Sequence, residues 1–76
     1  MFLSEGSAGK TYRIEKIDLE KNVSRRLAAL GMNELTKVSL IHKKKNGALV
    51  IMVRGTRLAL GLTITEKITV EEVPGV

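Results

Sequence analysis

The sequence predicts a mainly β fold, a small and strongly bent antiparallel barrel of five short strands, with one short α-helix after the first strand and a single helical turn before the last. Most of the chain falls into short segments in which apolar and polar residues alternate, as in half-buried strands. Only residues 22–32 have the period of an amphipathic helix. The 76 residues suffice for one core only, so we expect a single domain over residues 1–76.

The first strand is expected at residues 10–17, where Tyr12 and Ile14 fall on one side and polar or charged residues on the other. The preceding residues 3–9 are rich in Gly, Ser and Ala. Leu3 is the residue of this lead-in that is suited to anchor it in an apolar core.

The expected helix over residues 22–32 has an apolar stripe that must pack against another part of the protein. At helical spacing, Val23, Leu27 and Leu30 fall within one narrow stripe. A helix this short is not stable alone in water. We therefore expect the stripe to lie across the barrel.

Residues suited to capping stand at both ends of this expected helix. Asn22 can cap the first turn by accepting a hydrogen bond from an unpaired backbone N–H. Gly31 can adopt the left-handed conformation that closes the last turn, and Met32 would then fold back onto Leu27. The polar residues 33–36 form the turn that follows.

Residues 37–53 are expected to form a β-hairpin with Asn46-Gly47 at its tip, the dipeptide best suited to a two-residue turn with positive φ at both positions. This turn sets the register of the two strands. The predicted pairs are Lys45 with Ala48, Lys43 with Val50, His42 with Ile51, Ile41 with Met52, and Leu40 with Val53. One face then holds Val38, Leu40, Leu49, Ile51 and Val53, with His42 beside them. The other holds Ile41, Val50 and Met52, with Lys37, Ser39 and Lys43.

The second face of the hairpin is the candidate functional surface. A domain this small cannot bury both sides of a hairpin, so Ile41, Val50 and Met52 should be at least partly exposed. Two interpretations stay open. Either the helix or a terminus covers these side chains, or they form a partner-contact patch with basic residues around its edge. Methionine suits such a patch because its side chain is flexible and polarizable.

The chain then forms two further strands. After a tight bend at residues 54–56, residues 57–60 should form a short strand with Leu58 and Leu60 facing the core. The sequence T-I-T-E at residues 63–66 has the spacing of a capping box and predicts a single helical turn.

The last strand is expected at residues 69–73, with Ile68 and Val70 inward, and residues 74–76 form a tail. This strand closes the sheet into a barrel. Closure leaves few strand edges free for aggregation.

Composition narrows the class of protein. The chain has no cysteine, which excludes a disulfide framework and a thiolate zinc site. The N-terminus is too short and polar for a signal peptide, and no apolar run reaches the length of a membrane-spanning helix, so we expect a cytoplasmic protein. The formal net charge of +5 favours acidic partners, namely nucleic acid, anionic lipid or an acidic protein face.

The sequence lacks the residue patterns of a catalytic or metal site. There is no Gly-rich loop of the kind that binds phosphates. The chain has no thiol, and with His42 as the only histidine no hydroxyl nucleophile has a plausible general base. Ferrous iron favours imidazole and carboxylate ligands together, but His42 lies between Ile41 and Lys43, with no acidic residue at ligand spacing. We therefore expect no enzyme activity, no intrachain metal site and no cofactor.

A small basic barrel that binds nucleic acid is the alternative function. Such barrels stack bases on aromatic side chains within a basic groove. Phe2 and Tyr12 are the only aromatic residues, and neither interleaves with the lysine run at residues 43–45. Attraction to phosphate without sequence preference remains open, and it would weaken steeply with salt.

Four motifs, in order along the chain, resemble those of the FeoA family. R-L-A-A-L-G-M at residues 26–32 resembles the family's helix signature. V-R-G-T-R-L-A-L at residues 53–60 resembles its second signature, in which a glycine turn leads into a Leu-Ala-Leu strand. L-S-E at residues 3–5, with the later G-K pair, resembles its opening, and E-K-I-T-V at residues 66–70 resembles its close. FeoA proteins are small cytoplasmic ferrous iron transport proteins with an SH3-like barrel.

The chain also departs from this family. It has no glycine in the turn at residues 33–36, which changes the turn chemistry without altering the expected fold. It carries Gly61-Leu62 where members of the family often have an arginine. Any contact that such an arginine makes is therefore missing here.

The resemblance implies a role in bacterial or archaeal ferrous iron uptake. The chain would be an accessory or regulatory protein that acts by contact with the membrane transporter FeoB, at its cytoplasmic GTP-binding region. The candidates for this contact are Ile41, Val50 and Met52, with Lys43, Lys44 and Lys45 steering the encounter. Self-association through the same apolar face stays open as well.

Overall fold

A computed structural model of the chain describes residues 1–75, and Val76, the last residue of the predicted tail, lies outside the described residues. Five strands form one antiparallel sheet in the order β4-β3-β2-β1-β5. The strands are β1 (Thr11–Ile17), β2 (Lys37–Lys43), β3 (Leu49–Val53), β4 (Thr56–Leu60) and β5 (Ile68–Val73). The other elements are the 3-10 turn η1 (Leu3–Glu5), the helix α1 (Lys21–Ala29) and the helical turn α2 (Leu62–Thr65). The predicted class and order of elements are confirmed.

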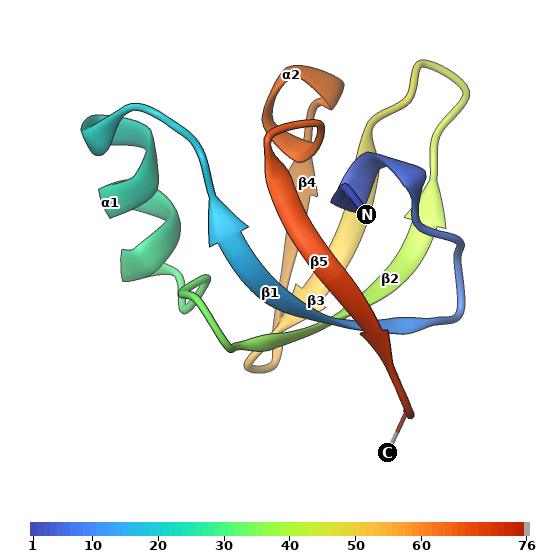
Figure 1. Cartoon of the computed structure of the whole chain (residues 1–76). Helices are drawn as coiled ribbons and strands as arrows, with labels where there is room; N and C mark the ends of the chain where they lie inside the picture. Colours follow the sequence, from blue (N-terminus) through green and yellow to red (C-terminus); the bar gives the residue numbers. More distant parts are fainter. Residues whose placement is uncertain (76) are drawn as a thin grey trace.

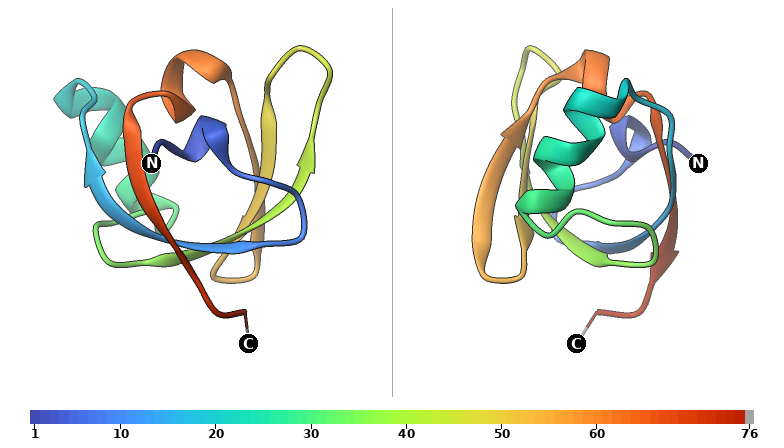
Figure 2. Two further views of the ribbon diagram at one scale, coloured as in Figure 1. Left: turned by 45° about the vertical axis from the view of Figure 1, so that its right-hand side comes forward. Right: turned by 90° about the vertical axis from the view of Figure 1, so that its left-hand side faces the viewer.

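The sheet bends strongly around its own inner face (Figure 1). Because β4 and β5 are the two edge strands, this bending brings the ends of the sheet toward each other. Figure 2 shows α1 lying across the side that the sheet leaves open. The helix therefore completes the enclosure of the core, as its apolar stripe predicted.

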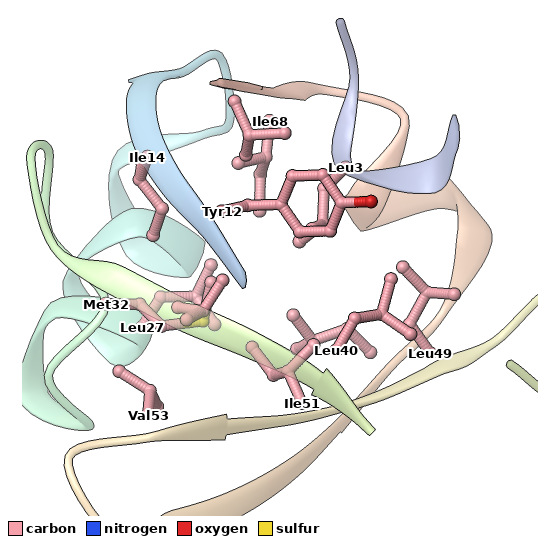
Figure 3. Packing of buried hydrophobic residues seen from close by; sticks show 13 residues of the cluster. Leu3, Tyr12, Ile14, Leu27, Met32, Leu40, Leu49, Ile51, Val53 and Ile68 are labelled. Carbon is pink, nitrogen blue, oxygen red and sulfur yellow. The ribbon is translucent and has the colours of Figure 1, made fainter. Parts of the chain in front are cut away.

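One apolar core fills the inside of the sheet (Figure 3). Its buried members are Leu3, Tyr12, Ile14, Leu27, Met32, Val38, Leu40, Leu49, Ile51, Val53, Leu60, Ile68 and Val70. The predicted anchor Leu3 and the alternating inward residues of the strands are among them, whereas Leu58 is only half-buried. The Tyr12 hydroxyl is satisfied inside this core, since it accepts a hydrogen bond from the Ser7 backbone N–H at 2.8 Å.

The helix begins earlier than predicted, and Asn22 is not its cap. Helix α1 starts at Lys21, the residue before it is Glu20, and no side chain caps the N-terminus. The Ser24 N–H instead donates to the Glu20 carbonyl at 2.9 Å. Asn22 lies inside the first turn, so its side chain is past the position from which it could accept the unpaired N–H groups.

The C-terminus of α1 closes as predicted, but the apolar stripe is different. Gly31 has φ +96°, and the Met32 N–H donates to the Leu27 carbonyl at 2.9 Å. Met32 is fully buried beside Leu27, whereas Leu30 is 46% exposed. The prediction that Leu30 belongs to the buried stripe is wrong because the helix ends at Ala29, and the chain reversal at Gly31 brings Met32 into the core instead.

The outer edge of β5 is covered by the N-terminus. Phe2 forms a bridge with Thr69, and the Val70 N–H donates to the Met1 carbonyl at 2.7 Å. This pairing occupies main-chain groups that an edge strand would otherwise present to other chains. It also places the two N-terminal residues beside the start of β5.

The turn α2 connects the two edge strands, but the predicted capping box does not form. The residue before the helix is Gly61, and no side chain caps the N-terminus. Thr63 lies within the helical turn and is therefore in the wrong place to cap it. Thr65 is fully buried, and its hydroxyl donates to the Gly61 carbonyl at 3.3 Å, which satisfies the polar group in the core.

Candidate docking surface

The β2–β3 hairpin turns through a longer loop than predicted. The Lys44 N–H donates to the Ala48 carbonyl at 2.8 Å, and the Gly47 N–H donates to the Lys44 carbonyl at 2.9 Å. Gly47 has φ +89°, while Asn46 is outside the positive-φ region. This is a three-residue loop closed by a left-handed glycine, a common alternative to the two-residue turn. The Asn46 side chain stabilises it by accepting the Ala48 N–H at 3.0 Å.

The register of the hairpin is correspondingly shifted. The observed pairs are Lys43 with Leu49, His42 with Val50, Leu40 with Ile51, and Ser39 with Met52. Between Leu40 and His42 the register changes by one residue, so Ile41 is the extra residue of a β-bulge. His42 therefore shares the outer face with Val50 and is exposed, and the prediction that it lies beside the core residues is wrong.

The expected apolar patch is present on the outer face of the sheet. Ile41 is 36% exposed, and Val50 and Met52 are half-buried. In β4, Ala59 is opposite Val50 and is exposed. We call these four residues the outer patch. Helix α1 packs its Leu27 into the core on the inner side of the sheet, and the N-terminus lies along β5, so neither segment covers the patch.

The three lysines of the hairpin tip do not surround the outer patch. Lys43 is opposite the inward-facing Leu49, and its ammonium donates to the carbonyls of Ser4 at 3.0 Å and Gly6 at 3.4 Å. It therefore fastens the hairpin to η1. Lys44 and Lys45 are exposed in the loop at the end of the barrel.

The basic residues nearest to the patch in the sheet come from other positions. Arg57 of β4 is directly opposite Met52, and Lys37 lies two residues before Ser39 on the same face of β2. Sequence reasoning missed the contribution of β4, although the tight bend after Val53 sets the β3–β4 register. That register alone would have placed Arg57 and Ala59 beside the patch.

The patch lies in a part of the chain without acidic residues. Glu34 and Glu66 are consecutive acidic residues in the sequence, and six Lys or Arg residues fall between them. This acid-free segment, residues 35–65, comprises β2, β3, β4 and α2. The remaining residues carry seven Lys or Arg and all eight acidic residues, so the net positive charge of the protein resides in the acid-free segment.

On the other half of the sheet, formed by β1 and β5, acidic and basic side chains form ion pairs. The Arg13 guanidinium contacts Glu15 at 2.9 Å and also Glu71, which is its direct partner across β1 and β5. The hydrogen bond that the Arg13 guanidinium donates to Glu15 lowers the pKa of the Glu15 carboxyl. Lys10 and Glu72 form a further pair at 3.5 Å. These exposed pairs stabilise the surface weakly.

The described residues offer little for metal or cofactor chemistry. A hollow of about 680 Å³ lies between α1 and α2, and its lining residues are Asp18, Leu19, Glu20, Val23, Thr63, Ile64 and Lys67. Within residues 1–75 there is no group of three His, Cys, Asp or Glu side chains that could hold a metal ion. Tyr12 is only 1% exposed and cannot stack on a base. None of the helices among these residues has the length and apolar character needed to span a membrane.

Comparison with known proteins assigns the chain to a family. The sequence model of the family described as "FeoA domain" matches residues 1–72 of this chain. The chain belongs to the FeoA family. A protein of Methanocaldococcus jannaschii assigned as Fe(2+) transport protein A is 30% identical over 70 residues, which are 92% of this chain and 84% of that protein.

Solved FeoA structures share the fold. The solution structure of FeoA from Chlorobium tepidum matches with a TM-score of 0.90 and 28% identity, over 100% of this chain and 73% of that one. The crystal structure of Stenotrophomonas maltophilia FeoA complexed with zinc, described as a prokaryotic SH3 domain protein, matches with a TM-score of 0.77 and 30% identity, over 93% of this chain and 89% of that one. The SH3-like barrel expected from the resemblance is thus confirmed.

Proposed function

We propose that this FeoA family member is an accessory protein of ferrous iron transport that acts by binding the cytoplasmic GTP-binding region of a FeoB-type transporter. Family membership supports the role in iron transport. The observation that supports action by protein contact is the outer patch, in which apolar side chains of three neighbouring strands stay uncovered. Such a patch with polar surroundings is typical of a protein-binding surface.

The outer patch has the chemistry of a contact centre. Ile41 and Met52 would bury their exposed area against an apolar partner surface, with Val50 between them. Arg57 and Lys37 lie at the rim and would meet acidic groups of the partner. Lys44 and Lys45 are too far along the hairpin to be part of this centre, but they add to the positive field that speeds the encounter.

Binding by itself does not change a partner. The FeoA protein can shift the nucleotide cycle or the assembly of the transporter only if it binds one state of the GTP-binding region more tightly than the other. A patch built on three hydrogen-bonded strands suits such discrimination, because it fits one arrangement of the partner surface and not another.

The test is a binding measurement with the purified GTP-binding region of the transporter from the same organism. We expect Ile41→Asp with Met52→Asp to weaken binding at least about tenfold, because two charges would enter the apolar centre of the contact. The matched control is Leu30→Asp with Leu35→Asp, which makes the same change at two exposed leucines away from the patch and should leave binding unchanged.

Folding has to be separated from binding in this test. Because Met52 lies on a central strand, Met52→Thr serves as a milder variant that keeps the strand preference while removing most of the apolar side chain. Both patch variants should retain the circular dichroism spectrum of the wild type. Full binding by a folded double aspartate variant would exclude the outer patch as the docking site.

A further inference from the structure

We propose that the protein has a second contact surface, the basic tip, which binds the anionic phospholipid surface of a membrane. The basic tip consists of Lys43, Lys44 and Lys45 at the end of the β2–β3 hairpin, together with Leu62 at the start of α2. This proposal goes beyond docking to a transporter and uses residues outside the outer patch. Its test is therefore independent of the test of transporter binding.

The hairpin loop and α2 are neighbours at one end of the barrel. A Cβ placed on Gly47 would lie 3.6 Å from a Leu62 methyl carbon, so the loop packs against this leucine. Leu62 nevertheless remains 46% exposed. Figures 1 and 2 show the loop and α2 projecting from the same end of the molecule, where a flat surface could touch both.

The backbone of the tip is held in a defined conformation. The loop is closed by the two main-chain bonds between Lys44 and residues 47 and 48, and it is fastened to η1 by the Lys43 ammonium. Among the ion pairs of residues 1–75, none involves Lys44 or Lys45. Their charges are therefore available to an external anion, and little ordering of the loop backbone is needed when one binds.

The composition of the tip favours a phospholipid surface over other acidic partners. A membrane interface presents phosphates above apolar chains, and an exposed leucine beside a loop that carries lysines matches both layers. Met1 and Phe2, which are 49% and 47% exposed, lie beside the start of β5, immediately after α2, and add apolar surface near this end. Nucleic acid would call for stacking side chains, and the loop has no aromatic residue.

The expected interaction is peripheral, weak and salt-dependent. Each lysine near an anionic membrane surface strengthens binding by about fivefold, and the attraction decays within a Debye length of about 10 Å at ordinary salt. Three lysines and one leucine therefore give reversible binding. The acid-free segment reinforces it, because no carboxylate of β2, β3, β4 or α2 opposes the attraction.

The test is sedimentation of the full-length protein with vesicles of equal parts phosphatidylglycerol and phosphatidylcholine, and with vesicles of phosphatidylcholine alone. We expect binding to the anionic vesicles only, and its loss when salt is raised. Lys44→Glu with Lys45→Glu should reduce the partition coefficient at least about tenfold. Leu62→Ser should reduce it by a smaller factor, because only the apolar contact is removed.

The matched control is Lys37→Glu with Arg57→Glu. It changes the net charge by the same amount within the same acid-free segment, but on the outer face of the sheet instead of the tip. This variant should retain most of the vesicle binding. Equal losses in the two double variants would overturn the proposal, because they would show attraction by net charge alone.

Two further outcomes would also overturn it. The first is an absence of wild-type binding to anionic vesicles at low salt. The second is tight binding to duplex RNA or DNA that depends on Lys44 and Lys45 while vesicles do not compete, which would assign the tip to nucleic acid. Failure of the transporter-binding test would leave the vesicle result unaffected, since different residues carry the two contacts.

Discussion

The sheet has two halves, β1 with β5 and β2 with β3 and β4. Both halves line the same apolar core, but the side chains on their outer faces differ. On β1 and β5, the outward-facing Arg13 is paired with Glu15 and Glu71. On β2, β3 and β4, apolar side chains stay partly exposed and no acidic residue is present. A surface whose charges are already paired gains little from a partner, whereas unpaired cations around apolar side chains gain both attraction and burial. The difference indicates that binding belongs to the acid-free segment.

The largest expected effect concerns the buried inner face, which both halves of the sheet share. Ile51 and Met52 are neighbours on β3 that face opposite sides of the sheet, one fully buried and the other half-buried. We expect Ile51→Ala to cost about 3 kcal/mol of unfolding free energy, because it leaves a cavity in the core. Met52→Ala should cost less than about 1 kcal/mol. Denaturant unfolding of both variants measures the difference, and equal costs would mean that the outer patch is part of the core.

A smaller effect is expected at the β3–β4 turn. Arg54 has φ +49° and is followed by Gly55 at φ +81°, so the two-residue turn with two positive φ values occurs here. Asparagine tolerates this conformation better, and Arg54→Asn should stabilise the fold by up to about 1 kcal/mol. Arg57→Asn is the matched control in the extended part of β4, where the same change should not stabilise. Thermal unfolding distinguishes them, and a loss of stability in Arg54→Asn would show that its side-chain contact over Gly31 matters more than the backbone strain.

A still smaller effect should follow from introducing an acidic residue into the acid-free segment. Lys37 is directly opposite Arg13 across β1 and β2, so two cations face each other at the boundary between the halves. Lys37→Glu should raise the thermal midpoint slightly, and the rise should shrink as salt is added. Lys45→Glu, which changes the same charge at the exposed loop, should show no such rise. A salt-independent increase would contradict an electrostatic origin.

The smallest expected effect is the pH dependence of stability that arises from the ion pair of Arg13 with Glu15 on β1. Because the hydrogen bond from Arg13 lowers the pKa of Glu15, this contact stabilises the fold at pH values above the ordinary carboxyl pKa. The contribution is lost as the pH falls through the lowered pKa. Carboxyl titration followed by NMR should show the pKa of Glu15 moving upward in Arg13→Gln. An identical titration in wild type and variant would mean that the contact does not persist in solution.

The hairpin shows why its faces could be predicted although its register could not. The longer loop shifts the pairing by one residue at His42, which reverses the face of that side chain. The bulge at Ile41 adds a second shift, and Leu40 returns to the inner face opposite Ile51. Two shifts restore the alternation, so the predicted core residues on both sides of the bulge were correct. The prediction was wrong for the residues between the two irregularities, since His42 lies on the outer face and Lys43 is opposite the inward-facing Leu49.

The choice of turn also depended on more than the local dipeptide. Asn46-Gly47 has the sequence preference for the two-residue turn, yet that turn forms at Arg54-Gly55, where the sequence preference is weaker. Around Gly47, the packing against Leu62 and the contact of Lys43 with η1 tie the hairpin to distant segments. Such tertiary contacts can override the local preference of a dipeptide. For the same reason the positions of Lys43, Lys44 and Lys45 relative to the outer patch could not be predicted.

The sequence by itself determined the inner face of the strands and the sorting of charge, because alternation and composition are local properties that folding does not alter. Leu3, Tyr12 and Ile51 were predicted as core residues and are fully or almost fully buried. Tertiary structure alone decided the ends of the helix, the exposure of Leu30 and the separation of the outer patch from the basic tip. Those features depend on contacts between segments far apart in the chain, whose energies exceed any single residue's local preference.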